Sequence, residues 1–297
     1  MKIVIAGASG LVGNALVAAL RIEGHEVRRL VRRAAQVPDE IRWDPVRGEI
    51  DRERISGVDA VVNLAGENLG AGRWTAARRE RILRSRIDAT RTLVAAVLGA
   101  AVKPAVFINA SAVGFYGDRG DEVLTEESSR GAGFLPDVCT AWESAAARVG
   151  QVGVRTVMLR FGVILAREGG ALAKMLPLFQ LGLGGPLGTG RQWMSWISLD
   201  DAVGAIRHAL RDERMRGPVN VVAPAPVTNA DFTRELGRAV RRPAFLPAPA
   251  WALRLVLGKG MADEALLGST RVEPRVLERV GYAFRHPTLA AALSRKL

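Results

Sequence analysis

The sequence predicts an α/β fold: a doubly wound parallel sheet followed by a smaller, mostly helical C-terminal region. Short apolar segments alternate with helical patterns from Lys2 to about Val222, and after about Thr228 the patterns are mostly helical. Alternation of this kind is typical of parallel strands joined by right-handed helical crossovers. A glycine-rich turn between the first apolar segment and the first helical pattern is the third observation, because it fits the first crossover of such a sheet.

The individual elements follow from local signals. We expect strands over residues 3–5, 26–33, 58–64, 105–110 and 154–161, and helices over 79–99 and 138–149. Residues 181–190 contain too many glycines for a regular element and are predicted to form a loop. Asp200 is expected to cap a helix that begins near Ala202. Because parallel strands end at one edge of their sheet, the turns at Gly7, Ala65-Gly66, Ala110-Ser111 and Phe161-Gly162 should line one crevice.

The turn after the first strand is the strongest motif. Gly7, Gly10 and Gly13 follow the apolar residues 3–5 directly and open a helix. Glycine at these positions lets the backbone turn tightly, approach a pyrophosphate closely and pack the helix against the strand. The free N–H groups of the helix N-terminus then attract phosphate, so Ser9, Leu11 and Val12 belong to the same expected site. The pattern predicts a Rossmann dinucleotide-binding domain.

The end of the second strand indicates which dinucleotide is bound. NAD-binding domains usually carry an acidic residue there for the ribose 2′-hydroxyl, whereas a nearby arginine suits a 2′-phosphate. This chain has Arg32 and Arg33 at that end, and its acidic residue, Glu26, stands at the start of the strand. We therefore predict that NADP(H) is preferred and NAD(H) is possible. The alternative is that Arg32 and Arg33 are ordinary surface arginines.

Composition excludes several classes of protein. The net charge is +12 over 297 residues, but the arginines are scattered and often stand beside acids, so no specific nucleic-acid partner is expected. No apolar run is long enough to span a membrane, no signal peptide is recognised, and Cys139 is the only cysteine. We expect a cytoplasmic protein with no membrane contact and no metal site. The oligomeric state is left open.

Several motifs together resemble a known family. They are NLAG at 63–66, NAS at 109–111 with FYG at 115–117, and WISLDD at 196–201. This set is similar to extended short-chain dehydrogenases/reductases. Further matches, at 63–68 (NLAGEN), 73–75 (RWT), 85–86 (SR), 142–143 (WE) and 182–186 (GLGGP), resemble the atypical "epimerase family protein" branch. The resemblance covers nearly the whole chain and implies a Rossmann core with a bound nicotinamide dinucleotide.

We accordingly expect residues 1–222 to form an NADP-binding domain, with residues 165–200 contributing to the substrate pocket. Residues 223–297 are expected to form a helical lid. The strand ends add Leu64, Ala65, Gly66, Ala110, Phe161 and Gly162 to the expected cofactor site. Arg86 is included because an arginine at this helix position suits an anion, either the cofactor's phosphate or an acidic substrate group. The alternative for Arg86 is a solvated helix residue.

The chemistry expected of the wider superfamily is missing. Its active members carry a Tyr-x-x-x-Lys pair in which the tyrosine transfers the proton and the lysine lowers the tyrosine's pKa. This chain has only two tyrosines, and the residue four positions after each is Gly120 or His286. Aligning Glu143 with the acidic residue that usually follows the pair places Leu135 and Cys139 at the tyrosine and lysine positions. A register shifted by three residues offers Val138 and Trp142.

Three other residues are candidates for proton transfer. Ser111 ends a predicted strand, but it stands one position away from the superfamily's catalytic serine, and a structural hydroxyl is the alternative. Glu67 follows a strand end and can act as a base if it is desolvated, or it can simply fix its loop. Tyr116 lies in a glycine-rich turn, where it can donate a proton or only pack.

The prediction for function is an NADP(H)-binding, epimerase/dehydratase-like oxidoreductase that acts on an unidentified small molecule. The alternative is a dinucleotide-binding protein without turnover, serving as a redox sensor or as a partner-binding module. The missing Tyr-x-x-x-Lys pair favours the alternative, and the retained loops favour the enzyme, because function is decided by the site and not by the fold.

Overall fold

The computed structural model describes residues 1–294 and is built on an eight-stranded sheet of order β12-β8-β6-β5-β1-β2-β3-β4. Its strands are β1 (Lys2–Ala6), β2 (Glu26–Val31), β3 (Glu40–Asp44), β4 (Glu49–Ile50), β5 (Ala60–Asn63), β6 (Val106–Ala112), β8 (Arg155–Phe161) and β12 (Gly217–Val221). Every neighbouring pair is parallel except β3 and β4. The predicted doubly wound parallel sheet is confirmed.

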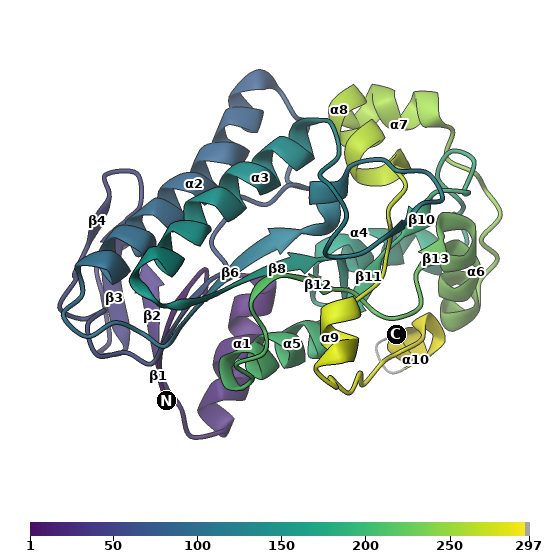
Figure 1. The fold of residues 1–297 in the computed structure, drawn as a ribbon. Helices are drawn as coiled ribbons and strands as arrows, with labels where there is room; N and C mark the ends of the chain where they lie inside the picture. Colours follow the sequence, from purple (N-terminus) through teal and green to yellow (C-terminus); the bar gives the residue numbers. More distant parts are fainter. Residues whose placement is uncertain (295–297) are drawn as a thin grey trace.

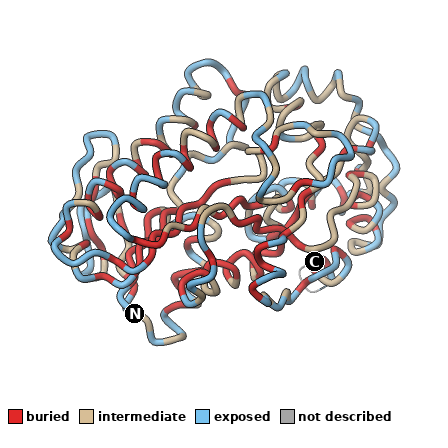
Figure 2. The backbone as a smooth tube through the Cα atoms, in the orientation of Figure 1, coloured by how far each residue is buried: buried red, intermediate tan, exposed pale blue. Residues whose placement is uncertain are grey.

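Helices cover both faces of this sheet (Figure 1). The helices α1 (Leu11–Ile22) and α5 (Leu199–Arg211) lie on one face, and α2 (Ala76–Gly99) and α3 (Phe134–Ala147) lie on the other. Strand β1 shows why, because its buried residues alternate between the two layers. Ile3 and Ile5 pack with the α1 and α5 core, whereas Val4 and Ala6 pack with the α2 and α3 core. Figure 2 shows the buried backbone concentrated along the strands.

The remaining elements lie outside the eight-stranded sheet and these four helices. They are η1 (Val113–Tyr116), β7 (Val123–Leu124), η2 (Arg148–Val152), β9 (Val163–Ala166), α4 (Gly170–Gln180), β10 (Trp193–Met194), β11 (Trp196–Ser198), β13 (Val227–Thr228), α6 (Asn229–Val240), α7 (Ala250–Leu257), α8 (Lys259–Met261), η3 (Ala262–Leu267), β14 (Arg271–Val272), α9 (Arg275–Arg279) and α10 (Leu289–Ser294). The predicted loop at 181–190 contains no helix or strand. After Thr228 the described chain is mainly helical, as expected.

The predicted cap of α5 is wrong in one detail. The helix begins at Leu199 rather than near Ala202, and its N-cap is Ser198, whose hydroxyl accepts the backbone N–H of Asp201 at 3.0 Å. Asp200 therefore lies inside the first turn and does not cap the helix. The sequence pattern did not identify Ser198 as the N-cap, because Asp200, two positions later, is a residue type that caps helices equally well.

One buried carboxylate, that of Asp201, ties the C-terminal region to α5. Its side chain accepts hydrogen bonds from the backbone N–H groups of Arg285 and His286 at 2.7 and 3.0 Å, and from the hydroxyls of Ser198 and Tyr282 at 2.7 and 3.2 Å. Asp201 is fully buried. A buried carboxylate is tolerated because donors replace the water that it loses. Asp201 thus joins the segment around residues 282–286 to the Rossmann helix, and a 3.0 Å contact between His286 Nδ1 and Ser198 Oγ adds to this connection.

This arrangement predicts a large effect for Asp201→Ala. The change leaves several buried donors without an acceptor, so the free energy of unfolding should fall by about 3 kcal/mol, measured by chemical denaturation. Asp231→Ala is the matched control, because Asp231 occupies the same Ser/Thr-x-x-Asp position at the start of α6 but has no C-terminal segment bound to it. The control should lose about 1 kcal/mol. Equal losses for the two variants would contradict the role assigned to Asp201.

Candidate functional site

The strand ends meet as predicted. In the parallel ladder Ala6 stands opposite Asn63, Asn63 opposite Asn109, and Ala112 opposite Phe161. Neighbouring parallel strands lie about 4.8 Å apart. The turns that follow β1, β5, β6 and β8 therefore share one edge of the sheet, and this edge is the place where open α/β sheets bind ligands.

Both steric room and backbone angles restrict which residues can stand in the turn after β1. Gly7 has φ of 77°, and a Cβ atom on it would lie 2.6 Å from the Leu64 carbonyl group. A Cβ atom on Gly13 would lie 2.2 Å from the Gly7 oxygen, so α1 can pack this closely only with glycine there. Gly10 differs, because its Cβ atom would lie 3.3 Å from the same oxygen, a contact that a small shift relieves. The fold itself therefore demands Gly7 and Gly13, but not Gly10.

The N-terminus of α1 is suited to an anion. Its N-cap residue, Gly10, offers no side chain to the first turn, and that turn contains no acidic residue. Ser9 and Gly10 are exposed, and Leu11 and Val12 follow in the first turn. The unoccupied N–H groups and the positive end of the helix dipole make such a terminus a phosphate-binding site. These residues fit the pyrophosphate of a dinucleotide.

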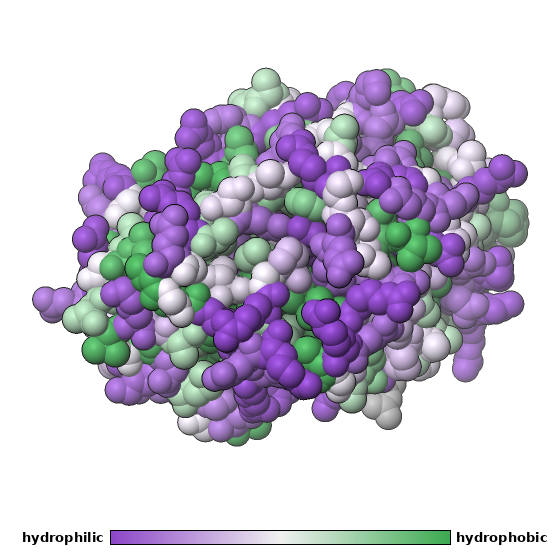
Figure 3. Space-filling model, viewed as in Figure 1, coloured by the Kyte–Doolittle hydropathy of each residue, from purple (hydrophilic) through white to green (hydrophobic). Residues whose placement is uncertain are grey.

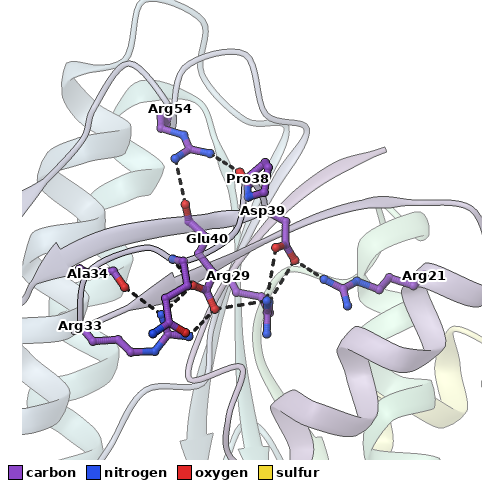
Figure 4. Close-up of polar contacts among 9 residues, drawn as sticks. Arg21, Arg29, Arg33, Ala34, Pro38, Asp39, Glu40 and Arg54 are labelled. Atoms are coloured by element: carbon purple, nitrogen blue, oxygen red, sulfur yellow. Dashed lines mark hydrogen bonds and ion pairs between the residues drawn. The ribbon is translucent and has the colours of Figure 1, made fainter.

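An ion-pair cluster surrounds the end of β2 (Figure 4). Glu40, which is 2 % exposed, accepts two hydrogen bonds from Arg33, at 2.7 and 2.6 Å, and one from the backbone N–H of Gln36 at 2.9 Å. The Arg33 guanidinium lowers the pKa of Glu40 to about 2. Arg29 bonds Asp39 at 3.1 Å and lies 3.3 Å from Glu40. Arg33 and Arg29 are therefore already neutralised by acids.

Arg32 differs from its neighbours in this cluster. It follows the last residue of β2, its side chain is exposed, and no ion pair joins it to any acid among residues 1–294. The turn after β2 lies beside the turn after β1, so this exposed cation stands at the same edge of the sheet as the glycine turn. The structure thus separates two arginines that look equivalent in the sequence.

A buried amide pair supports the loop after β5. The side-chain amide of Asn63 donates to Thr90 Oγ1 at 2.9 Å and to Asn109 Oδ1 at 2.7 Å, and its oxygen accepts the backbone N–H of Ala65 at 3.2 Å. Asn63 and Asn109 are fully buried. The positions of Leu64, Ala65 and Gly66 are therefore set by β6 and α2 together.

Arg86 supports the same loop through contacts with its backbone. Its guanidinium donates to the carbonyl oxygens of Ile82 and Glu67 at 3.0 and 3.1 Å and lies 5.1 Å from the centre of the Trp142 ring. Only 9 % of the residue is exposed, so the alternative of a solvated helix arginine is wrong. A Cβ atom on Gly66 would lie 3.1 Å from the Arg86 guanidinium carbon, so glycine is what lets the loop rest on it.

Glu67 points into an ion-pair group rather than standing alone. Its carboxylate lies 3.1 Å from Arg78 and 3.6 Å from Arg81, and its side chain is 29 % exposed. Its backbone N–H donates to Ser85 at 3.0 Å. Desolvation of an isolated carboxylate is the usual means of producing a strong base, and this environment provides opposite charge and water instead.

Ser111 lies in a buried polar network at the end of β6. Its hydroxyl donates to Glu143 Oε1 at 2.7 Å. Glu143 also accepts two hydrogen bonds from Arg160, both of 2.8 Å, and both side chains of this pair are at least nine-tenths buried. The network therefore joins β6, α3 and β8 directly beneath the shared edge of the sheet.

Tyr116 completes this network on the far side of Arg160. Its hydroxyl donates to Asn220 Oδ1 at 2.7 Å and accepts from Arg160 Nη1 at 2.9 Å. The residue is fully buried, and burial raises the pKa of its hydroxyl. Both hydrogen-bonding roles of the hydroxyl are already filled by protein groups. Tyr116 is thus placed as a packed member of the core rather than as a group open to a substrate.

Helix α3 carries the residues of both registers. Leu135, Cys139 and Glu143 stand on one side of the helix; Leu135 approaches Gly114, and the Cys139 sulfur lies 3.7 Å from the Ala112 oxygen. Val138 packs with Trp74 and Ile82, and Leu135 also packs against this group. Neither register places a tyrosine or a lysine on the helix. Burial raises the pKa of the Cys139 thiol to about 11, which keeps it protonated near neutral pH.

Sequence reasoning missed part of this network. Glu143 was used only as an alignment landmark, and Arg160 and Asn220 carried no motif. The buried position of Arg160 within an apolar strand was the available signal, because buried charges are almost always paired. Trp196, which begins the WISLDD motif, is fully buried and donates to the Ala225 oxygen at 3.0 Å, so it is a packing residue.

Among residues 1–294 no group of three or more His, Cys, Asp or Glu side chains is placed to hold a metal ion. Within the same residues, none of the helices combines the length and the apolar character that crossing a membrane requires.

Comparison with known proteins identifies the family. Residues 3–222 match the model of the NAD dependent epimerase/dehydratase family, and residues 248–295 match a domain of unknown function, DUF1731. An epimerase family protein of Mycobacterium leprae is 48 % identical over 98 % of this chain and 94 % of its own length. The epimerase family protein SDR39U1 of Bos taurus is 39 % identical over 99 % of this chain and 98 % of its own length.

Solved structures agree with the sequence comparison. A crystal structure of the human epimerase family protein SDR39U1 with NADPH has a TM-score of 0.91 and 36 % identity, covering 99 % of this chain and 98 % of that one. A nucleoside-diphosphate sugar epimerase from Corynebacterium glutamicum has a TM-score of 0.83 and 38 % identity, covering all of this chain and 58 % of that one. The chain therefore belongs to the NAD dependent epimerase/dehydratase family, with the DUF1731 segment at its C-terminus.

Proposed function

We propose that this protein binds NADPH and acts as an epimerase/dehydratase-like oxidoreductase on a small-molecule substrate, without a Tyr-x-x-x-Lys pair. The glycine turn, the uncapped N-terminus of α1 and the free cation of Arg32 support the cofactor assignment. The NADPH-containing structure of the human relative supports it independently. The nicotinamide, when bound, accepts or donates a hydride, and the chain supplies position, electrostatics and a proton path.

The hydrogen bond from Ser111 to Glu143 is the observation on which the chemical part of the proposal depends. It directs the serine proton to the carboxylate. In the proposed reaction an oxygen lone pair of Ser111, which is 3 % exposed and also contacts the Cys139 thiol, accepts a hydrogen bond from a substrate hydroxyl. When that hydroxyl is oxidised, its proton passes to Ser111 as the serine proton passes to Glu143. Reduction of a carbonyl group uses the same path in reverse. Arg160 holds Glu143 in place throughout.

The other two candidates are weaker on geometry. Glu67 is engaged by Arg78 and Arg81, and Tyr116 is enclosed by Arg160 and Asn220. We therefore assign Glu67 to fixing its loop and Tyr116 to the support of Arg160. Ser111 remains as the candidate, because it lies at the end of β6 by the shared edge of the sheet and its hydroxyl donates to Glu143.

The residues of α3 also favour a second function, that of a dinucleotide-binding protein without turnover. Leu135 carries no titratable group, and the thiol of Cys139 stays protonated near neutral pH. Neither can replace the missing pair. The two functions differ in one measurement, which is turnover of NADPH with pools of aldehydes, ketones and sugar nucleotides. Tight NADPH binding with no turnover in any pool would favour the second function.

The cofactor assignment predicts a response to Arg32→Asp. The parent protein should bind NADPH more tightly than NADH, and the variant should lose about tenfold or more of its NADPH affinity, because a charge-assisted contact to the 2′-phosphate becomes a repulsion. Titration calorimetry with both cofactors measures this. Arg91→Gln is the control, since Arg91 is also exposed but lies on α2. No preference for NADPH in the parent protein would refute the role given to Arg32.

The glycine turn predicts two contrasting variants. Gly10→Ala should fold with nearly the parent's thermal stability but bind NADPH much more weakly, because its methyl group projects where the pyrophosphate approaches. Gly13→Ala should be strongly destabilised, because its methyl group overlaps the Gly7 carbonyl. Thermal unfolding and NADPH titration separate the two effects. Undiminished NADPH affinity in Gly10→Ala would show that the pyrophosphate does not lie against Gly10.

The proton path predicts that Ser111→Ala lowers kcat by about a hundredfold, the lower range for removal of a proton-transfer group, while leaving NADPH affinity unchanged. Ser269→Ala is the matched control, because Ser269 is likewise a buried serine that donates a hydrogen bond, in this case to the Gly120 oxygen. The assay uses whichever carbonyl or alcohol substrate the screen identifies. Turnover equal to that of the control would exclude Ser111 from the reaction.

A further inference from the structure

The exposed large hydrophobic residues of this protein are not scattered. Within residues 1–294, every exposed leucine, phenylalanine and tryptophan lies in two short segments, and the other exposed apolar residues are valine, isoleucine or methionine. The first segment, at the end of α4, contributes Leu178, Leu181 and Leu183. The second contributes Phe245, Leu246, Trp251, Leu255 and the neighbouring Val256. We name these eight residues the apolar patch.

The two segments lie side by side. The backbone N–H of Leu246 donates to the Gly184 oxygen at 3.2 Å, and that of Ala248 donates to the Pro186 oxygen at 2.9 Å. The Arg242 guanidinium donates to the Gln180 oxygen at 3.1 Å. Helix α7 begins two residues after this ladder, and none of its eight residues is buried. The two segments are therefore adjacent where residues 184–186 meet residues 246–248, and α7 follows directly along the chain.

Side chains of this size are rarely left in water without a reason. Phe245, Trp251 and Leu255 are 71, 68 and 69 % exposed. Burying one such side chain contributes about 1.5–3 kcal/mol, so a group of them on two adjacent segments indicates an interaction surface. Figure 3 shows hydrophobic atoms at the edge beside α6, bordered by strongly hydrophilic ones.

The hydrophilic border is cationic. A cavity of about 680 Å³ beside the patch is lined by Arg234, Arg238, Arg241, Arg242 and Phe245. Arg254 and Lys259 add two cations from α7 and α8. The acids paired with these six cations are three: Asp231 with Arg234, Glu235 with Arg238, and Asp263 with both Arg254 and Lys259. The border thus carries an excess of positive charge.

Arg241 stands out within this border. It is the one non-glycine residue among residues 1–294 with positive φ, at 55°, where it ends helix α6. Glycine is the residue preferred at such a helix end, and an L-residue there costs about 1 kcal/mol. No acidic side chain in the described chain pairs with it. The fold alone therefore gives no reason for arginine at this position.

We propose that the apolar patch and its arginine border dock on a membrane surface that contains anionic phospholipids. Trp251, Leu255 and Phe245 would enter the interfacial layer, and the arginines lining the cavity would contact lipid phosphates. Charge decides the occupant, because a second copy of the chain would bring one cationic border against another. Such docking lies on the membrane and needs no spanning helix. It departs from the sequence-based expectation of no membrane contact, which rested on the lack of a spanning segment.

The first experiment is sedimentation of the purified full-length protein with vesicles. The expected result is binding to vesicles of phosphatidylcholine mixed with phosphatidylglycerol, no binding to phosphatidylcholine alone, and weaker binding at high salt. Equal binding to both kinds of vesicle, or binding to neither, overturns the proposal. Gel filtration of the same sample provides the competing outcome, because self-association that Leu255→Glu abolishes would assign the patch to a second copy and overturn the proposal.

Variants separate this surface from the general basicity of the protein. Leu255→Glu should abolish vesicle binding, whereas Ile22→Glu, at a position that is 87 % exposed on α1, should not. Arg241→Gly should weaken vesicle binding about fivefold and at the same time raise the melting temperature, since glycine relieves the helix end. A misfolded variant cannot produce both changes together. Equal losses for Leu255→Glu and Ile22→Glu, or unchanged vesicle binding of Arg241→Gly, would refute the assignment.

Discussion

The buried ion pair between Arg160 and Glu143 is the constraint on which the site depends. It is the point at which α3 is fixed to the centre of the sheet, and through Ser111 and Tyr116 it sets the ends of β6 and of the turn that follows it. Removing one partner of such a pair costs about 3–5 kcal/mol, because the other charge is left buried alone. The ion pair is therefore required for the fold, whether or not a reaction also uses it.

This constraint explains why the catalytic assignment narrows to one residue. The Tyr116 hydroxyl donates to Asn220 and accepts from Arg160, so both of its hydrogen-bonding roles are filled, whereas the hydroxyl of Ser111, which is also buried, lies at the end of β6 and donates to Glu143. Helix α3 holds neither a tyrosine nor a lysine in either register. In the proposed chemistry, the proton-transfer group is therefore a residue at the end of β6, whereas in the superfamily it is a residue of the helix that corresponds to α3.

The sequence was sufficient for the sheet and the glycine turn, because alternating patterns and positive-φ glycines are local signals. It was insufficient for the polar network, in which Ser111, Glu143, Arg160 and Asn220 come from four elements and meet only after folding. The error at Asp200 has a local cause, since Ser198 was an equally good cap. The difference between Arg32 and Arg33 could not be seen either, because it depends on Glu40, which lies on the neighbouring strand.

The hydrogen bonds of Asp201 have a consequence for the order of events during synthesis. The helix that carries this carboxylate emerges from the ribosome about eighty residues before its donors around Arg285. Until those residues appear, a charged group destined for complete burial has only Ser198 to stabilise it. The nucleotide-binding layer therefore cannot reach its final packing as an independent nascent domain. It is completed from its C-terminal end, when the last turns of the chain fold back over α5.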